Sequence, residues 1–139
     1  MSDRIFVLYF PMLVMFLWTF AVMLRNVQVR LRSVARGELT NEYFELFEGG
    51  RPSEVLTKTG NHLKNLFEFP TLFYAVLLLA AVLGQASVVV VVLAWLYVGL
   101  RIGHTLVHLT FNKVPARFAF YFSSNIVLLV LWVYVGTLG

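Results

Sequence analysis

The sequence predicts an all-α integral membrane protein whose single domain is a bundle of four transmembrane helices. Hydrophobic residues make up 60% of the 139 residues and charged residues only 13%, whereas charged residues form roughly a quarter of a soluble domain. Four apolar runs, at about 5–24, 64–83, 88–110 and 118–138, each have about the ~20 residues that a helix needs to cross a bilayer. Short connections separate the last three runs, and a longer polar segment at about 26–60 follows the first.

The first run, Ile5 to Leu24, is uncharged, and a basic residue follows it without a small-residue cleavage site. We therefore interpret it as a retained span and not as a secretory signal. The polar segment 26–60 carries charges of both signs, and the sequence Gly49-Gly50-Arg51-Pro52 marks it as a loop. Its two ends are expected to continue the flanking helices into water.

The second run, Leu63 to Gly84, is apolar over most of its length but opens with Lys64, Asn65 and Glu68. A carboxylate inside a membrane span is energetically expensive, so such a residue usually has a function. Pro70 lacks a backbone N–H and predicts a kink close to these polar residues. This run is expected to form one wall of a polar site.

The third and fourth runs also carry polar residues at helical spacing. The turn between the second and third runs ends at Ser87, which is a candidate N-cap for the third helix. Polar residues at i, i+3, i+4 and i+7 share one face of a helix. In the third run these residues are Arg101, His104, Thr105 and His108, and in the fourth run Arg117, Tyr121, Ser124 and Asn125 follow a similar spacing.

The distribution of basic residues predicts the orientation in the membrane. Seven Lys and Arg residues lie between Arg25 and Lys64, and two more, Lys113 and Arg117, lie at the last connection. By the positive-inside rule, the 26–60 and 111–117 loops face the cytoplasm and both termini face the opposite side. Membrane topology thus explains the net charge of +4, and no nucleic-acid partner is expected.

Counting depth along the helices places Glu68 and Arg101 at one level, both roughly 6–9 Å inside the cytoplasmic boundary. An unpaired charge at that depth is costly, so we predict that the two residues form a buried ion pair. Such a pair either serves the site or locks two helices together. The same count gathers Lys64, His104 and Arg117 in one layer whose net positive charge suits an anion.

Several chemistries are disfavoured by the sequence. The chain has no cysteine, so a reactive thiol has to belong to a ligand. His104 and His108 have zinc-ligand spacing, but no HExxH motif and no third ligand beyond Glu68 accompany them, so no metal site is expected. A channel is disfavoured because the polar groups are confined to one edge and leave no path through a single chain.

In their order along the chain, these residues resemble the MAPEG family, the membrane-associated proteins of eicosanoid and glutathione metabolism. The resemblance extends from Asn61 to Leu131 and rests on three motifs: Asn65-x-x-Glu68 followed by Pro70, Arg101-x-x-His104-Thr105, and Pro115-x-Arg117 with Tyr121 one turn further on. Together, in this order and hydropathy context, the motifs are fairly specific.

The resemblance implies a left-handed four-helix bundle that assembles as a homotrimer and holds glutathione, the co-substrate, between subunits near the cytoplasmic side. It also implies roles for seven residues. Lys64, Asn65 and Glu68 would bind the tripeptide, Arg117 would be the catalytic residue that stabilises its thiolate, Tyr121 would line the site, and Arg101 and His104 would support or line the pocket.

The activity implied is that of a glutathione-dependent transferase or peroxidase acting on hydrophobic small-molecule electrophiles dissolved among membrane lipids. The alternative is a non-catalytic member that binds a lipid or a partner protein. Three residues depart from the family pattern: Asn61 stands in place of an arginine, His108 in place of a tyrosine and Phe118 in place of a hydroxyl donor. These departures favour a bacterial-type member of the inner membrane over an eicosanoid synthase.

Overall fold

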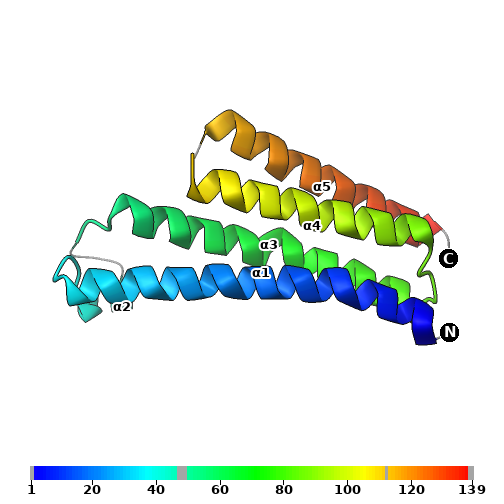
Figure 1. Cartoon of the computed structure of the whole chain (residues 1–139), viewed down its shortest axis with the longest axis horizontal. Coiled ribbons are helices and arrows are strands. Elements are labelled where there is room, and N and C mark those ends of the chain that lie inside the picture. Colours follow the sequence, from blue (N-terminus) through cyan, green and yellow to red (C-terminus); the bar gives the residue numbers. More distant parts are fainter. Residues whose placement is uncertain (1, 47–49, 112, 138–139) are drawn as a thin grey trace.

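The computed structural model describes residues 2–46, 50–111 and 113–137, which form five helices and no strand (Figure 1). The helices are α1 (Ser2–Ala35), α2 (Asn41–Leu46), α3 (Glu54–Val82), α4 (Val88–Leu109) and α5 (Val114–Thr137). All except α2 are long and apolar enough to cross a membrane. The predicted fold class is therefore confirmed, and the protein is an integral membrane protein built as a four-helix bundle.

The bundle consists of two antiparallel helix pairs. Helix α1 packs along α3, α4 and α5 form a hairpin, and α4 also contacts α1 and α3 (Figure 1). Both ends of the chain and the α3–α4 turn lie at one end of the bundle, whereas the long connector and the α4–α5 turn lie at the other (Figure 1). The two polar connections thus share one end, which we call the polar end.

The connector between α1 and α3 is more ordered than the sequence indicated. As expected, its two ends continue the flanking helices, because α1 runs on to Ala35 and α3 begins at Glu54. The interior was predicted to be loop, but it contains the short helix α2. Helix α2 forms because Tyr43 joins Val29, Leu39 and Leu56 in a small apolar cluster apart from the main core.

Local sequence signals explain how the turn between α3 and α4 is made. Gly84 has a φ of +70°, a left-handed conformation that glycine adopts without steric cost. The N–H groups of Gly84 and Gln85 donate to carbonyls in the last turn of α3, which satisfies groups that a helix end leaves unpaired. Ser87 then caps α4 as predicted, because its Oγ accepts a hydrogen bond from the backbone N–H of Val90 at 3.3 Å.

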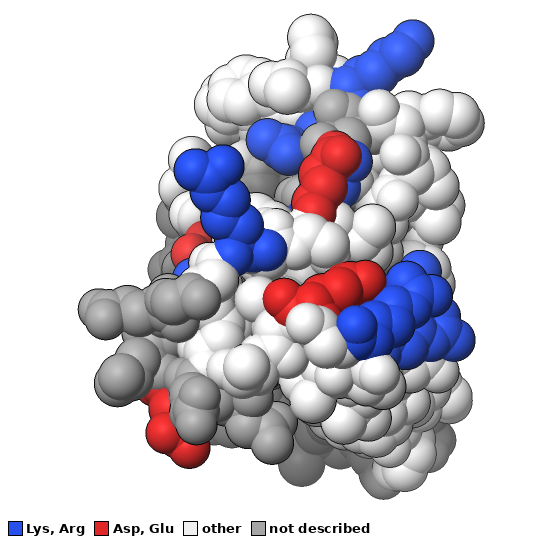
Figure 2. Space-filling view, turned by 90° about the vertical axis from the view of Figure 1, so that its left-hand side faces the viewer, with Lys and Arg blue, Asp and Glu red and all other residues white. Residues whose placement is uncertain are grey.

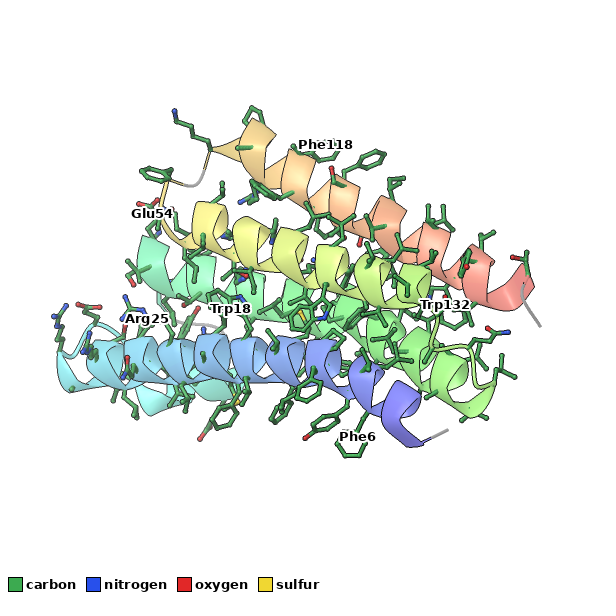
Figure 3. The ribbon with its side chains drawn as sticks, turned by 45° about the vertical axis from the view of Figure 1, so that its right-hand side comes forward. Phe6, Trp18, Arg25, Glu54, Phe118 and Trp132 are labelled. Atoms are coloured by element: carbon green, nitrogen blue, oxygen red, sulfur yellow. The ribbon has the colours of Figure 1, made fainter. Side chains whose placement is uncertain are left out.

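The core follows a stripe of large side chains along each long helix. Met15, Phe73, Tyr97 and Leu131 are fully buried, and the rings of Phe73 and Tyr97 stack with centroids 4.5 Å apart. Large apolar side chains also cover the outside of all four long helices (Figure 3). This outer surface fits hydrocarbon, where helices satisfy their own backbone hydrogen bonds.

Candidate functional site

A cavity of about 590 Å³ opens between α3, α4 and α5 near the polar end. Figure 2 looks onto this end, where basic and acidic side chains both reach the surface. Six of the seven site residues predicted from the sequence line the cavity: Lys64, Asn65, Glu68, His104, Arg117 and Tyr121. The structure therefore brings together residues that are up to 57 positions apart in the sequence, from Lys64 to Tyr121.

Helical periodicity places these side chains on the cavity wall. On α3, the residues Asn61, Lys64, Asn65 and Glu68 line the cavity and follow one another at i, i+3, i+4 and i+7, which is one face of a helix. His104 and His108, at i and i+4, contribute the face of α4. Arg117 and Tyr121 have the same spacing on α5. The wall is thus set by three regular helices and not by loops.

Arg101, the seventh predicted residue, lies beneath the cavity and does not line it. Its side chain is completely buried. Its Nε donates a hydrogen bond to the Tyr97 hydroxyl at 3.0 Å, and its Nη2 donates to Asn125 Oδ1 at 3.4 Å. The guanidinium also lies 5.3 Å from the ring centre of Tyr121, which lines the cavity, and 6.0 Å from that of Phe69.

The predicted ion pair between Glu68 and Arg101 is wrong. The ion pairs among the described residues are Arg36–Glu38 and Glu54–Lys58, and Glu68 is exposed. A count of depth along the membrane does not fix rotation about the helix axis. Glu68 follows the core residue Leu66 by two positions, which is roughly 200° around the helix, so Glu68 lies off the buried face of α3 and lines the cavity instead.

Aromatic rings and neutral oxygens hold the Arg101 guanidinium in place of a carboxylate. A cation over an aromatic face is attracted by the ring quadrupole, and hydrogen bonds to a charged group contribute more than those between neutral groups. One nitrogen, Nη1, is buried without a hydrogen-bond partner. The site therefore keeps the positive charge of Arg101 without a neutralising anion beside it.

A cluster of three buried histidines, His62, His104 and His108, backs the cavity. Ring centroids are 5.3 Å apart for His62 and His104, 4.8 Å for His62 and His108, and 5.7 Å for His104 and His108. His62 was not among the site residues predicted from the sequence. It precedes the buried residues Leu66 and Pro70 at helical spacing, so the apolar stripe of α3 was the signal that could have located it.

Hydrogen bonds to Thr105 select the tautomer of a neutral His62 ring. The Thr105 hydroxyl donates to the Arg101 carbonyl at 2.9 Å and accepts from the Trp18 indole N–H at 3.0 Å. Its single proton is then used, so the 2.9 Å contact with His62 Nε2 requires the imidazole to donate. The other nitrogen of His62, Nδ1, is consequently an acceptor, and it is buried without a partner. Trp18 points from α1 into the bundle in Figure 3.

The histidines do not form a metal centre in this structure. No group of three or more His, Cys, Asp or Glu side chains that could hold a metal ion occurs among residues 2–46, 50–111 and 113–137. The Nδ1 atoms of His104 and His108 are also buried without hydrogen-bond partners. A buried acceptor or donor left unpaired costs roughly 1–3 kcal/mol, so these ring nitrogens are available to a further hydrogen-bond partner.

A model of the MAPEG family matches residues 8–137, which is nearly the whole chain. The protein belongs to the MAPEG family. Membership agrees with the four-helix membrane bundle described above, and the family includes both glutathione transferases and non-catalytic members. No curated protein and no solved structure matched the chain. The choice between these activities therefore depends on the chemistry of the cavity.

Proposed function

We propose that the protein is a glutathione-dependent transferase or peroxidase that acts on lipophilic electrophiles at the membrane. The observation that carries this proposal is that Lys64, Asn65, Glu68, His104, Arg117 and Tyr121, which come from three helices, all line one cavity. Its volume of about 590 Å³ lies within the range of ~300–1,000 Å³ that is usual for small-molecule sites.

The cavity offers a partner for each kind of polar group in glutathione other than the thiol. Lys64 can pair with a carboxylate of the tripeptide, Glu68 with its ammonium group, and the Asn65 amide with a peptide group. These three residues follow one another along one face of α3, so an extended peptide can meet them in sequence. Arg101, which is buried below Tyr121, supports the cavity floor and adds positive potential.

Arg117 is assigned the role of stabilising the thiolate. A free thiol has a pKa of about 8.5 and is mostly protonated at neutral pH, and a neighbouring guanidinium lowers the pKa and raises the fraction of nucleophilic thiolate. The thiolate sulfur then bonds to the electrophile as the leaving group departs with the bonding electrons. With a hydroperoxide, an S–O bond forms as the O–O bond breaks, the alkoxide takes up a proton, and a second glutathione thiol condenses with the sulfenic acid to give the disulfide and water. The protein supplies no covalent nucleophile.

The hydrophobic substrate reaches the thiolate from the bilayer. Phe118 lines the cavity and is 61% exposed, and Phe122, which is 54% exposed, stacks on it with ring centroids 5.7 Å apart. Figure 3 shows Phe118 on the outer side of α5. These rings give an apolar path along α5 from lipid to the cavity.

A non-catalytic binding role is the second candidate, and Asn61 favours it. Asn61 lines the cavity and is exposed, and it occupies the position where the family resemblance leads us to expect arginine. An amide cannot replace the bidentate, charged contact that arginine makes with a carboxylate. A lipid or a partner protein would then occupy the cavity without reaction.

One pair of assays separates these two functions. Purified protein is titrated calorimetrically with glutathione and then assayed for conjugation of glutathione to a model aryl halide. We expect binding and turnover in the native protein, and a loss of turnover of at least tenfold in Arg117→Ala. Lys113→Ala is the matched control, because Lys113 is an exposed cation one turn earlier that does not line the cavity. Turnover that Arg117→Ala leaves unchanged would refute the catalytic assignment.

The proposal extends to assembly as a homotrimer with glutathione between neighbouring subunits. Lys64 and Glu68 line not only the site but also a second cavity, of about 630 Å³, which is formed with α1 and α2. Both residues therefore lie between two hollows on one chain, where a neighbouring subunit can close the site. Native mass spectrometry in detergent should give three chains per particle, and a monomer that binds glutathione with full affinity would contradict the shared site.

We also place the protein in a bacterial inner membrane with the polar end in the cytoplasm. The chain contains no cysteine, so a single cysteine introduced at Arg51 or Lys113 reports its side of the membrane without background. A membrane-impermeant maleimide added to intact cells should leave both positions unlabelled until the membrane is opened. Labelling of either position in intact cells would show that the polar end faces outward and would contradict the proposed orientation.

A further inference from the structure

We propose that the cluster of His62, His104 and His108 receives the proton that bound glutathione loses when its thiolate forms. This inference rests on the proposed function and extends it, because stabilising a thiolate by Arg117 does not say where the thiol proton goes. His104 and His108 line the cavity, and His62 packs behind them with no exposure to solvent. The three rings thus connect the cavity to the protein interior.

Unpaired ring nitrogens are the feature of the cluster that can accept a proton. All three Nδ1 atoms are buried without partners. The bond from His62 Nε2 to Thr105 at 2.9 Å leaves Nδ1 of His62 as a lone-pair acceptor, because Thr105 uses its own proton on the Arg101 carbonyl. The cluster therefore contains at least one acceptor that no neighbour in the described chain satisfies.

The spacing of the rings allows a proton to be shared. An N–H···N hydrogen bond of ~3 Å between two imidazoles, with each nitrogen ~1 Å from its ring centre, separates the ring centres by roughly 5 Å. The three observed separations run from 4.8 to 5.7 Å. Small side-chain rotations are enough to turn one added proton into a hydrogen bond between two rings, which spreads the positive charge over the cluster.

His104 is the residue that takes the proton from sulfur. Its ring lies 5.7 Å from that of Tyr121, which is one turn beyond Arg117, so it faces the position assigned to the thiolate. In the step, the S–H bond breaks and an N–H bond forms on the neutral imidazole, giving a thiolate and an imidazolium. When the thiolate reacts, its negative charge leaves with the departing anion. The imidazolium then releases its proton to water, so one proton and one anion are released for each conjugate formed.

The surrounding charges couple proton uptake to ligand binding. Lys58 on α3 and Arg117 on α5 line the same cavity as His104 and His108, and Arg101 is buried on α4 one turn before His104. Glu54 and Glu68 are the acidic side chains that line the cavity, Lys64 is a further cation there, and Tyr121 contributes a phenol. Because these cations oppose a further positive charge on the histidines, an anion bound in the cavity favours proton uptake by the cluster.

The test counts protons as glutathione thiolate forms. Purified protein is titrated with glutathione in buffers of different ionisation enthalpy, which gives the protons released per ligand, while the ultraviolet absorbance of the thiolate is followed in parallel. We expect the native protein to release fewer than about half a proton per thiolate. His62→Gln keeps a donor to Thr105 but cannot take a proton. In this variant we expect release of about one proton per thiolate. We also expect the pH midpoint of thiolate formation to rise by about one unit, which is a tenfold loss of thiolate at a fixed pH below the midpoint.

Thr59→Val is the matched control, because Thr59 is buried on α3 one turn before His62 and bonds to Asn26 outside the cavity. Native protein that releases one proton per thiolate would overturn the inference, as would His62→Gln with the native midpoint. If the native protein binds no glutathione, the proposed function falls and this inference falls with it. If His62→Gln does not fold, His108→Gln is measured in its place, and the proton count of the native protein decides in either case.

Discussion

Replacing Arg101 by methionine should change the free energy of unfolding by less than about 2 kcal/mol. The substitution removes hydrogen bonds to Tyr97 and Asn125, worth roughly 1.5–3 kcal/mol each when the donor is charged. It also removes contacts with aromatic rings at 5.3–6.0 Å, worth about 0.5–2 kcal/mol each. Against these losses stands the cost of burying a guanidinium, several kcal/mol, which methionine does not incur. The opposing contributions are of similar size.

A double-mutant cycle with Glu68→Gln tests whether Arg101 depends on Glu68 as an ion-pair partner. If Glu68 and Arg101 formed a buried ion pair, each single substitution would cost about 3–5 kcal/mol and the double mutant would recover much of it. Because Glu68 is exposed and unpaired with Arg101, we expect Glu68→Gln to lie within about 0.5 kcal/mol of the native protein, with a coupling energy below about 0.5 kcal/mol. Unfolding is followed by tryptophan fluorescence during denaturation from micelles. A coupling of 3 kcal/mol or more, by the scale of broken buried pairs, would refute the reasoning.

Three further substitutions test other parts of the structure. Asn61→Arg should tighten glutathione binding in isothermal titration about tenfold, or ~1.4 kcal/mol. The reason is that arginine adds a bidentate partner for a carboxylate at the cavity wall. An unchanged affinity would mean that the ligand binds elsewhere. Gly103→Ala should destabilise the fold by about 1–3 kcal/mol, because its Cβ would lie 2.6 Å from the Phe120 ring, whereas Gly99→Ala meets nothing within 4 Å and is the control; equal thermal midpoints would argue against this close approach of α4 and α5. Ser87→Ala should cost about 1 kcal/mol through loss of the α4 N-cap, and a stability equal to that of the native protein would mean that the cap is dispensable.

Hydropathy predicted the four long helices because membrane spans must be long, apolar and internally hydrogen-bonded. The cap of α4 at Ser87 was also predictable, because serine is a preferred N-cap residue and its position follows the turn directly. Helix α2 was missed because it depends on a tertiary contact, the packing of Tyr43 against Val29, Leu39 and Leu56, and a six-residue helix has little stability of its own.

The residues around the cavity were predictable to the extent that helical spacing determines which side chains share a face. Lys64, His104 and Arg117 were expected in one layer, and all three line one cavity. Their partners were not predictable, because contact between helices depends on rotation about each axis as well as on depth. The same limitation explains both errors on α3, the misassigned partner of Glu68 and the missed His62, which lies on the buried stripe of that helix.

The incorrect ion pair changes how the site should be understood. A carboxylate against Arg101 would cancel its charge and leave the cavity with a weaker field. In the structure, the guanidinium is instead held by Tyr97, Asn125 and the faces of aromatic rings, none of which carries a negative charge to neutralise it. Its potential therefore extends past Tyr121 into the cavity, where low dielectric surroundings weaken it less than water would. The guanidinium has no anionic partner among the described residues, and glutathione, with two carboxylates and an ionisable thiol, is the anion that the proposed function brings to the cavity.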